Sequence, residues 1–464
     1  MVERHETSIN SPAQRGGGIQ RFWQSAQDAA IPRIDRAEGL HIWDTAGRRY
    51  IDVTSGPVAV NLGHGNARVL RAMQEQASRV CFAYPSAFES ESNVRLGERL
   101  AEQAGMGLDC AFFVSGGSEA VEKCLQFARR YAMAIGQKAR YKIISRNPSY
   151  HGSTRATMAL AADPGYAAFL PAGQTGIHVP APWSYRPADG MDARTYAQQC
   201  AESLRATIIA EGPETVLAFI IEPVMGFCGG ADHAPAEYYR RVREICDEFG
   251  VLLIYDEIIS GAGRTGKFLA AHWWTGANPD LVTLAKGIGG GYYPLAAFLA
   301  PSRLVDAVVG AGGFHVGHTH KAQPLACAVG LAVLEETIER NLIAQADEVG
   351  AYRRARLESL KNEAPIVGDV SGLGMLNAVE IVADPSSKAM LPRTLDVVGR
   401  IQALARDEGL LIYGRRTHAG KFGDWFMVTP PLITTRADVD EIVGGIGGAL
   451  RAYTQELRQA GHLA

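Results

Sequence analysis

Val251-Leu-Leu-Ile-Tyr-Asp256-Glu257, followed later by Leu281-Val-Thr-Leu-Ala-Lys286-Gly287, is the stretch that decides the fold of this chain. Each half is a short apolar run that meets a charged residue at its end. Short apolar runs of this kind are typical of strands buried on both faces of a parallel sheet. Open α/β sheets place ligands at the carboxyl ends of such strands. We therefore expect Asp256 and Lys286 to meet at one edge of a sheet.

Apolar runs and helical patterns alternate on the N-terminal side of this stretch. Strands are predicted at 111–114, 141–145 and 216–221, and helices at 119–133 and 236–248. A hairpin with its turn at 45–47 and a helix over 66–80 are expected before them. The alternation predicts an α/β fold with a mostly parallel sheet covered by helices on both faces.

The pattern changes after Pro324 and predicts a smaller α+β domain. Helices are expected at 325–340 and 344–361, strands at 375–382 and 425–428, and a last helix from Arg436. A chain of 464 residues exceeds the usual size of a single core. We expect an N-terminal arm that shares the small domain (1–69), a large domain (70–324) and a C-terminal small domain (325–464).

Composition and charge exclude several classes of function. The net charge of −3 supplies no field that attracts nucleic acid or an anionic membrane. No apolar window reaches the roughly 18 residues of a membrane span, and residues 1–18 lack the apolar core of a signal peptide. The seven cysteines are scattered, without CxxC pairs, so a reducing cytoplasm is the expected compartment.

The residues at the predicted sheet edge have the chemistry that pyridoxal 5′-phosphate (PLP) requires. A lysine amine can hold the cofactor, and a carboxylate can keep a pyridine ring protonated. Ser115-Gly116-Gly117-Ser118, between a strand and a helix, can cradle a phosphate, and Tyr150 can stack on a ring. Each feature also has an ordinary interpretation: a solvated lysine, a capping aspartate, Ser/Gly capping or a core tyrosine.

Other patterns point elsewhere, with weaker support. Gly261–Gly266 matches GxGxxG, but Asp256 and Glu257 separate it from the strand and no helix is predicted next. A histidine cluster at 315, 318 and 320 lies in a glycine-rich loop without an accompanying carboxylate or cysteine, so we expect no metal. Cys327 is interpreted as a packing residue.

With these residues in view, the chain resembles the class III aminotransferases of PLP fold type I, which implies a large domain with a mostly parallel, seven-stranded sheet and a smaller α+β domain built from the N- and C-terminal parts. The most specific part of the resemblance is the segment 251–266, followed by Pro279-Asp280 and Lys286-Gly287. Further matches occur in the same order along most of the chain: Asp44–Asp52, Asn61–Gly65, Gly117–Ala120, Tyr150–Gly152, Glu222-Pro223 and Pro430-Pro431.

The resemblance implies a role for each matched residue. Lys286 is the Schiff-base lysine and Asp256 the partner of the pyridine nitrogen. Thr319 reaches the phosphate of a neighbouring subunit, which implies a homodimer with shared sites. The remaining implied cofactor contacts are Tyr150 and Ile258 on the ring faces, Gly116, Gly117 and Ser118 at the phosphate, His151 beside them, and Glu222 near the ring O3′.

Departures from the family pattern concern the phosphate, the ring and the substrate. Gly116 stands where many members carry Ser or Thr, and Ile259 replaces a frequent glutamine. Phe227 stands where members acting on ornithine or 4-aminobutyrate carry glutamate. Expected substrate residues are Phe82, Tyr84 and Phe227, with Arg415 or Arg416 either clamping a carboxylate or lying solvated.

The sequence therefore predicts a transaminase that works by a ping-pong mechanism. It would pass an amino group from an amine or ω-amino acid to pyruvate or another 2-oxo acid. Alternatives on the same fold are an amino-acid epimerase or aminomutase, and a decarboxylating transaminase. A binding protein without activity is disfavoured, because it would have no use for the lysine–aspartate pair.

Overall fold

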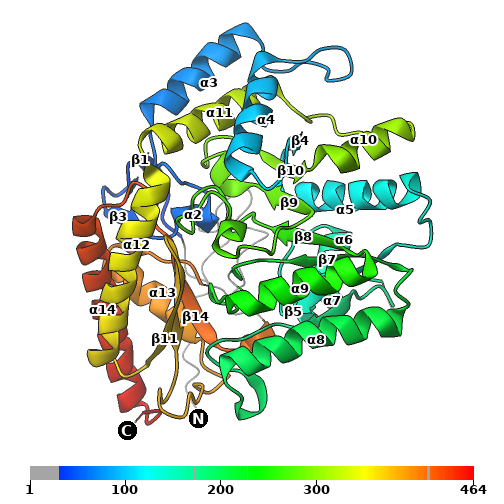
Figure 1. The fold of residues 1–464 in the computed structure, drawn as a ribbon. Helices are drawn as coiled ribbons and strands as arrows, with labels where there is room; N and C mark the ends of the chain where they lie inside the picture. The colour runs from blue at the N-terminus through cyan, green and yellow to red at the C-terminus, as the bar shows by residue number, and fades with distance from the viewer. Residues whose placement is uncertain (1–30, 172, 227, 415–417, 464) are drawn as a thin grey trace, which may run out of the picture.

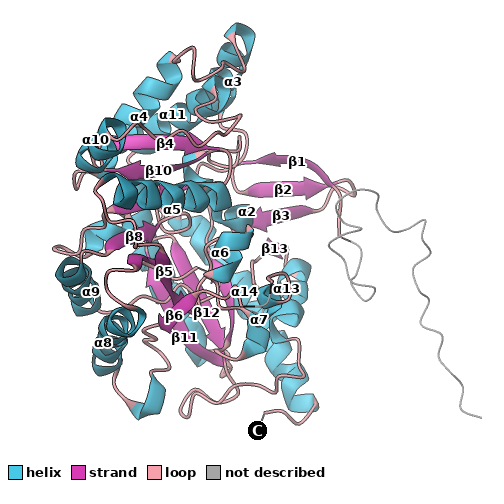
Figure 2. Ribbon diagram, turned by 90° about the vertical axis from the view of Figure 1, so that its right-hand side faces the viewer, coloured by secondary structure: helices cyan, strands magenta, loops and turns pink. Residues whose placement is uncertain are grey.

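The computed structural model describes residues 31–171, 173–226, 228–414 and 418–463. Within them, the largest element is a seven-stranded sheet with the order β4-β10-β9-β8-β7-β5-β6 (Figures 1 and 2). Every strand pair is parallel except those made by β10, which is antiparallel to both β4 and β9. The predicted α/β class with a mostly parallel sheet is confirmed. The strands are β4 (Cys110–Val114), β5 (Lys142–Asn147), β6 (Ile177–Pro180), β7 (Val216–Ile221), β8 (Leu252–Asp256), β9 (Leu281–Leu284) and β10 (Ala296–Ala300).

Alternating side chains of the central strands bury both faces of this sheet. In β8, Leu252 and Ile254 pack with helix α5 (Gly117–Ala134) in one cluster of the core. Leu253 and Tyr255 point the other way, into the cluster that holds α8 (Ala193–Glu211) and α9 (Ala236–Phe249). Because neither face meets water, charged side chains can be accommodated only at the strand ends.

The carboxyl ends of three strands bring the predicted functional residues to one edge. Asp256 is the last residue of β8 and lies in register with Thr283 of β9. Lys286 follows two residues after the end of β9. Strand β4 is antiparallel to β10, which is antiparallel to β9, so the turn from β4 into α5 opens at the same edge. The sequence prediction that Asp256 and Lys286 share an edge is confirmed.

The N-terminal and C-terminal segments build two further sheets together. The predicted hairpin is present, and a C-terminal strand adds to it in parallel to β3, in the order β1-β2-β3-β13. A second sheet has the antiparallel order β11-β12-β14. The strands are β1 (Ile34–Glu38), β2 (His41–Asp44), β3 (Arg49–Asp52), β11 (Val367–Leu373), β12 (Leu376–Ile381), β13 (Leu410–Leu411) and β14 (Asp424–Val428).

Helices α12, α13 and α14 lie around these smaller sheets, on the left in Figure 1. Core residues Ile51 and Val53 share a cluster with the C-terminal residues Phe426 and Val428, so both ends of the chain contribute to one core. The domain boundaries at residues 69 and 324 stay a prediction. The helices not yet given are α2 (Ser55–Val58), α3 (Ala67–Arg79), α4 (Glu91–Ala104), α6 (Arg155–Ala159), α7 (Pro164–Ala167), α10 (Ser302–Gly310), α11 (Pro324–Glu339), α12 (Leu342–Ser359), α13 (Val397–Asp407) and α14 (Arg436–Gln459).

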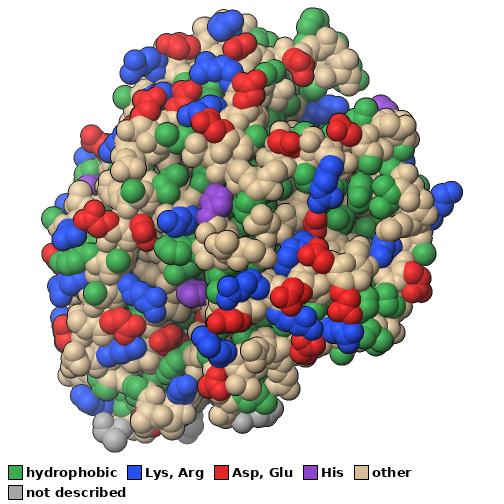
Figure 3. All heavy atoms as spheres, viewed as in Figure 1, with side chains coloured by type: hydrophobic (Ala, Val, Ile, Leu, Met, Phe, Trp, Pro, Cys, Tyr) green, Lys and Arg blue, Asp and Glu red, His purple; other side chains and the backbone are tan. Residues whose placement is uncertain are grey.

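The surface mixes charges of both signs. On the face shown in Figure 3, acidic and basic side chains alternate, in keeping with the small net charge of −3. Among the described helices, none has the length and apolar character needed to cross a membrane. All cysteines of the described residues are free thiols.

Arg264 joins the N-terminal, central and C-terminal parts of the chain. It is 1% exposed, and its guanidinium donates to Asn61 Oδ1 at 2.5 Å, to the Thr429 carbonyl at 3.3 Å and to the Pro430 carbonyl. Burial lowers the pKa of Arg264 to about 9, although the charge of Asp52 acts in the opposite direction. Removing this side chain would leave several buried acceptors without a donor.

We expect Arg264→Ala to lower the thermal unfolding midpoint by about 5 °C or more, because each orphaned buried acceptor costs about 1–3 kcal/mol. Arg451→Ala is the matched control, since Arg451 pairs with Glu363 at the surface, and exposed pairs contribute about 1 kcal/mol or less. Differential scanning fluorimetry measures both. Equal midpoints for the two variants would contradict the role of Arg264 as a cross-link.

Candidate active site

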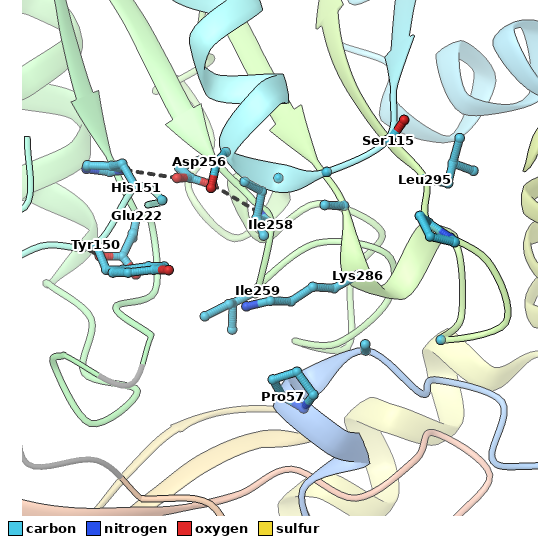
Figure 4. A pocket seen from close by; sticks show the side chains of 18 of the residues that line it. Pro57, Ser115, Tyr150, His151, Glu222, Asp256, Ile258, Ile259, Lys286 and Leu295 are labelled. Carbon is cyan, nitrogen blue, oxygen red and sulfur yellow. Dashed lines mark hydrogen bonds and ion pairs between the residues drawn. The ribbon is translucent and has the colours of Figure 1, made fainter. Parts of the chain in front are cut away.

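A cavity of about 510 Å³ opens at the carboxyl edge of the large sheet. Figure 4 shows that side chains from separate strands and loops point into it. Its lining combines a lysine, two carboxylates, a glycine-rich turn and aromatic rings. The lining residues are Pro57, Ala59, Ser115, Gly116, Gly117, Ser118, Tyr150, His151, Gly152, Glu222, Asp256, Ile258, Ile259, Ala285, Lys286, Gly291, Tyr292, Tyr293, Pro294, Leu295 and Tyr413.

Lys286 reaches into this cavity from the turn that follows β9. Its backbone has φ +46°, a left-handed conformation that is uncommon for a residue with a side chain. Figure 4 shows the side chain extending past Ile259, with its nitrogen inside the cavity. Burial lowers the pKa of Lys286 to about 8, while the charges of Asp256 and Glu222 act in the opposite direction. The interpretation of Lys286 as a solvated surface lysine is therefore wrong.

The glycine after Lys286 is required by close packing. A Cβ atom at Gly287 would lie 2.5 Å from Asn61 Nδ2 and 3.0 Å from Ala262 Cβ. Any larger residue would push the lysine turn away from the segments that it packs against. The glycine-rich run thus allows the strand end to approach its neighbours.

Asp256 is held by three donors at the floor of the cavity. Its Oδ2 lies 2.8 Å from His151 Nδ1, and its Oδ1 accepts from Thr283 Oγ1 at 3.1 Å and from the Ile258 N–H at 3.2 Å. Because an ionised carboxylate is only an acceptor, His151 Nδ1 carries the proton. Asp256 is 5% exposed and a turn, not a helix, follows it, so the interpretation as a helix cap is wrong.

The turn from β4 into α5 provides backbone N–H groups at a helix start. Helix α5 begins at Gly117, and the first N–H groups of a helix have no partner within it. A Cβ atom at Gly117 would lie 3.0 Å from Ile258 Cδ1. A Cβ atom at Gly152 would lie 2.6 Å from Ser118 Oγ, so a glycine is needed for that hydroxyl to fit. This concave, dipole-favoured turn can bind a phosphate.

Glu222 and Tyr150 lie on the far side of the cavity from this turn (Figure 4). Glu222 is buried and accepts from the Tyr150 N–H at 2.9 Å and the Gly226 N–H at 2.8 Å. This carboxylate therefore fixes the backbone of the loop that carries Tyr150. Ile258 and Ile259, directly after β8, contribute an apolar surface to the lining.

Some predicted site residues lie elsewhere in the single chain. Phe82 is 44% exposed and Tyr84 63% exposed, and neither lines the cavity. Thr319 is also exposed, in the loop between α10 and α11. Phe227, Arg415 and Arg416 fall outside the described residues. The functional roles of all these residues stay predictions.

Several lining residues had no chemical signal in the sequence. Pro57 and Ala59 come from the N-terminal segment, Tyr413 from the C-terminal segment, and Tyr292 and Tyr293 from the loop before β10. Sequence patterns identify charged residues and glycines at strand ends. The apolar residues of a cavity wall have the same sequence pattern as core residues, so the sequence does not single them out. The sequence feature that could have identified the two tyrosines as lining residues is their position directly after the glycine run.

The alternative motifs have structural explanations. Glu257 accepts from Ser260 and from the Ala270 and Ala271 N–H groups, so it stabilises the 256–271 turns. Gly261–Gly266 leads into turns instead of a nucleotide-binding helix. Burial raises the pKa of the Cys327 thiol to about 12, as befits a packing residue. Within the described ranges, no three potential metal-ligating side chains gather.

The fold and this site define a PLP-dependent enzyme of fold type I. The lysine amine, the three-donor aspartate, the glycine-bounded helix start and the cavity volume fit the aldehyde, pyridine nitrogen, phosphate and ring of that cofactor. The chain belongs to the family described as Aminotransferase class-III, whose profile matches residues 23–450. It is a PLP-dependent aminotransferase.

Relatives along nearly the whole chain support this assignment. The diaminobutyrate–2-oxoglutarate transaminase of Halomonas elongata is 36% identical, covering 94% of this chain and 93% of its own. A probable gamma-aminobutyrate transaminase 3 of Oryza sativa subsp. indica is 30% identical, covering 94% and 85%.

Solved structures agree with the sequence relatives. An (S)-enantioselective omega-transaminase from Thermomicrobium roseum has a TM-score of 0.85 at 34% identity, covering 91% of this chain and 92% of its own. The omega-transaminase from Pseudomonas jessenii in complex with PMP has a TM-score of 0.87 at 31% identity, covering 96% of both chains. These comparisons give no support to the isomerase alternative.

We expect cofactor-free protein to capture PLP at a rate that rises with pH and is half-maximal near pH 8. Only the neutral amine attacks an aldehyde, and burial lowers the pKa of Lys286 to about 8. Asp256→Asn should move the midpoint to lower pH, because the negative charge of Asp256 raises that pKa. Stopped-flow absorbance measures the rate of PLP capture. The same measurement with free butylamine in place of the protein corrects for the effect of pH on the ionisation of PLP itself. A midpoint at the ordinary lysine value of 10.5 would contradict the effect of burial.

Proposed function

We propose that this aminotransferase passes an amino group from an amine or ω-amino acid to pyruvate or another 2-oxo acid, with Lys286 and Asp256 as its central residues. The observation that carries the proposal is that these two side chains, from adjacent strands, line one cavity. Among the residues that the structure describes in that lining, no other lysine is present.

Lys286 is proposed to hold the cofactor and then to move a proton. Bound PLP supplies an electron sink that stabilises negative charge at the donor carbon. Once released from the cofactor, the Lys286 amine would take a proton from that carbon and would deliver it to the former aldehyde carbon of the cofactor, so that the amino group stays with the cofactor when the oxo product leaves. A pKa lowered to about 8 keeps a useful fraction of this amine neutral near physiological pH.

Asp256 is proposed to keep the pyridine nitrogen protonated. Its carboxylate is oriented by His151 and Thr283, so it could hold the nitrogen of a bound pyridine ring without first reorienting. An opposite charge at contact distance stabilises a pyridinium. Tyr150 and Ile258 are proposed to hold the two ring faces, and Glu222 to lie near O3′.

Gly116, Gly117 and Ser118 are proposed to hold the phosphate. The positive end of the α5 dipole and the free N–H groups of its first turn favour a dianion there. Gly116 contributes no hydroxyl and its N–H is bound by Glu119 Oε2, so its proposed part is to shape the turn, and the binding rests on the N–H groups from Gly117 onward and on Ser118.

We also propose a homodimer that works in the cytoplasm, with Thr319 completing the phosphate site of the neighbouring subunit. The segment from residue 80 to residue 94 exposes Phe82, Tyr84 and Phe88 together. Exposed apolar side chains grouped in this way are typical of a protein interface. A second subunit would also bring Phe82 and Tyr84 toward a cavity that they do not line in one chain.

The proposed donors carry an amino group at the end of a carbon chain, as the names of the relatives suggest. The described lining is rich in apolar and aromatic side chains, and its carboxylates are engaged by Tyr150, Gly226, His151 and Thr283. These carboxylates cannot bind a substrate carboxylate, because like charges repel. We assign that recognition to Arg415 or Arg416, which follow the lining residue Tyr413 in the sequence.

We expect Lys286→Ala to abolish the visible absorbance of the lysine-bound cofactor and to reduce turnover by more than about 1,000-fold. Asp256→Asn should reduce turnover by a similar order while still binding cofactor. Lys361→Ala is the control, since Lys361 pairs with Glu358 at the surface. Absorbance spectra and amine:pyruvate turnover measure these effects. A Lys286→Ala protein that keeps its chromophore, or an Asp256→Asn protein with normal turnover, would refute the assigned roles.

We expect Arg415→Ala or Arg416→Ala to raise the KM for a 2-oxo acid by about tenfold, the value of one charge-assisted contact, with less effect on the KM for a monoamine. Steady-state kinetics with pyruvate and a carboxylate-free amine separate the two constants. Equal changes in both, or no change in either, would reject the carboxylate clamp.

A further inference from the structure

The loop that carries Thr319 is fastened along helix α5. Arg130 Nε donates to the Gly313 carbonyl at 2.9 Å, and Lys123 Nζ donates to the Gly317 carbonyl at 3.2 Å. Nearest to the start of the helix, His318 Nε2 lies 3.1 Å from Glu119 Oε2. The loop is thereby placed next to the turn proposed to hold a phosphate.

A single carboxylate oxygen joins this loop to that turn. Glu119 Oε2 accepts from the Ser115 N–H at 3.1 Å and the Gly116 N–H at 3.0 Å, besides its contact with His318. His318 Nε2 thus lies at ion-pair distance from a carboxylate oxygen whose two other contacts are hydrogen bonds from the backbone. The other ring nitrogen of His318, Nδ1, is buried without a hydrogen-bond partner among the described residues. Glu119 is thus the side-chain partner that the structure gives to this ring.

The charges explain why a histidine suits this position. Glu119 satisfies the two N–H groups that precede α5 and leaves those from Gly117 onward for an anion. A bare carboxylate so close to a bound phosphate would repel it. The ring nitrogen of His318, 3.1 Å from Glu119 Oε2, is close enough to offset part of that repulsion, in a site that is partly shielded from water.

We propose that Glu119 and His318 are a positioning pair that sets two phosphate sites at once. Glu119 shapes the turn of its own chain, and through His318 it fixes the loop whose Thr319 serves the partner subunit. This inference rests on the proposed cofactor contacts and on the proposed homodimer. Neither residue takes part in proton transfer.

Cofactor-free protein titrated with PLP and, separately, with pyridoxal tests the pair. Both aldehydes can bond to Lys286, but only PLP uses the phosphate site. Glu119→Ala and His318→Phe should weaken PLP binding about tenfold, the value of a lost charge-assisted hydrogen bond, and change pyridoxal binding by less than about twofold. Glu119→Gln, which keeps the acceptor oxygen, should recover most of the loss.

Glu122→Gln is the matched control on the same helix. Glu122 accepts from Thr154 Oγ1 at 2.7 Å, so within the described part of the chain its carboxylate is bound away from the loop. We expect it to bind both aldehydes like the unaltered protein. Unchanged PLP binding in Glu119→Ala and His318→Phe would overturn the proposal, as would equal losses for PLP and pyridoxal, which would indicate general damage.

Mixed dimers test the action across subunits. A His318→Phe chain paired with a Lys286→Ala chain should lose part of its PLP affinity at its intact Lys286, because its own Glu119 is left uncompensated although the partner supplies the intact loop. An unaltered chain paired with a Lys286→Ala/His318→Phe chain should also bind PLP more weakly, because the loop that completes its site is no longer fixed. Normal PLP affinity in either mixed dimer would overturn the proposal that the pair acts on both sites. A monomeric mass by light scattering, or a chromophore retained in Lys286→Ala, would instead count against the proposed function.

Discussion

The site depends on one constraint: Lys286 and Asp256 place opposite charges at the edge of a sheet that is covered on both faces. Both faces of β8 and β9 are apolar, so a charge is tolerated only where a strand ends. There, Asp256 is compensated by His151, Thr283 and a backbone N–H. Burial of the Lys286 amine is only partly offset by nearby carboxylates, which lowers its pKa and so increases the fraction present as the neutral, nucleophilic amine near neutral pH.

The remaining walls of the cavity come from distant parts of the chain that must be held against this edge. Pro57 and Ala59 arrive with the N-terminal segment, and Tyr413 with the C-terminal one. Arg264 binds both segments from the turn after β8, within ten residues of Asp256 in the chain. The same turn region therefore carries the proposed catalytic carboxylate at one end and the cross-link of the smaller sheets at the other, so site geometry and domain packing depend on each other.

Much of the architecture was predictable because its signals are local. Short apolar runs predicted β7, β8 and β9 within a residue, and a glycine turn predicted the β2–β3 hairpin. Strand β10 was not predicted. Its alanine-rich sequence, Ala296–Ala300, has little strand propensity, and pairing with β4 and β9 on both sides stabilises it. Helix α8 was also missed, since its apolar face is diluted by alanines.

By itself the sequence indicated the chemistry: a glycine-rich helix start, an aspartate and a lysine, each at the end of a predicted strand, in the order typical of one enzyme family. Only the tertiary structure decided the surroundings of those groups. His151 as the partner of Asp256, Glu119 as the link to His318, and the apolar walls around Pro57 and Tyr413 all arise from contacts between segments far apart in the chain. Charge and backbone preferences are local properties of a residue, whereas burial and hydrogen-bond partners depend on what the fold brings beside it.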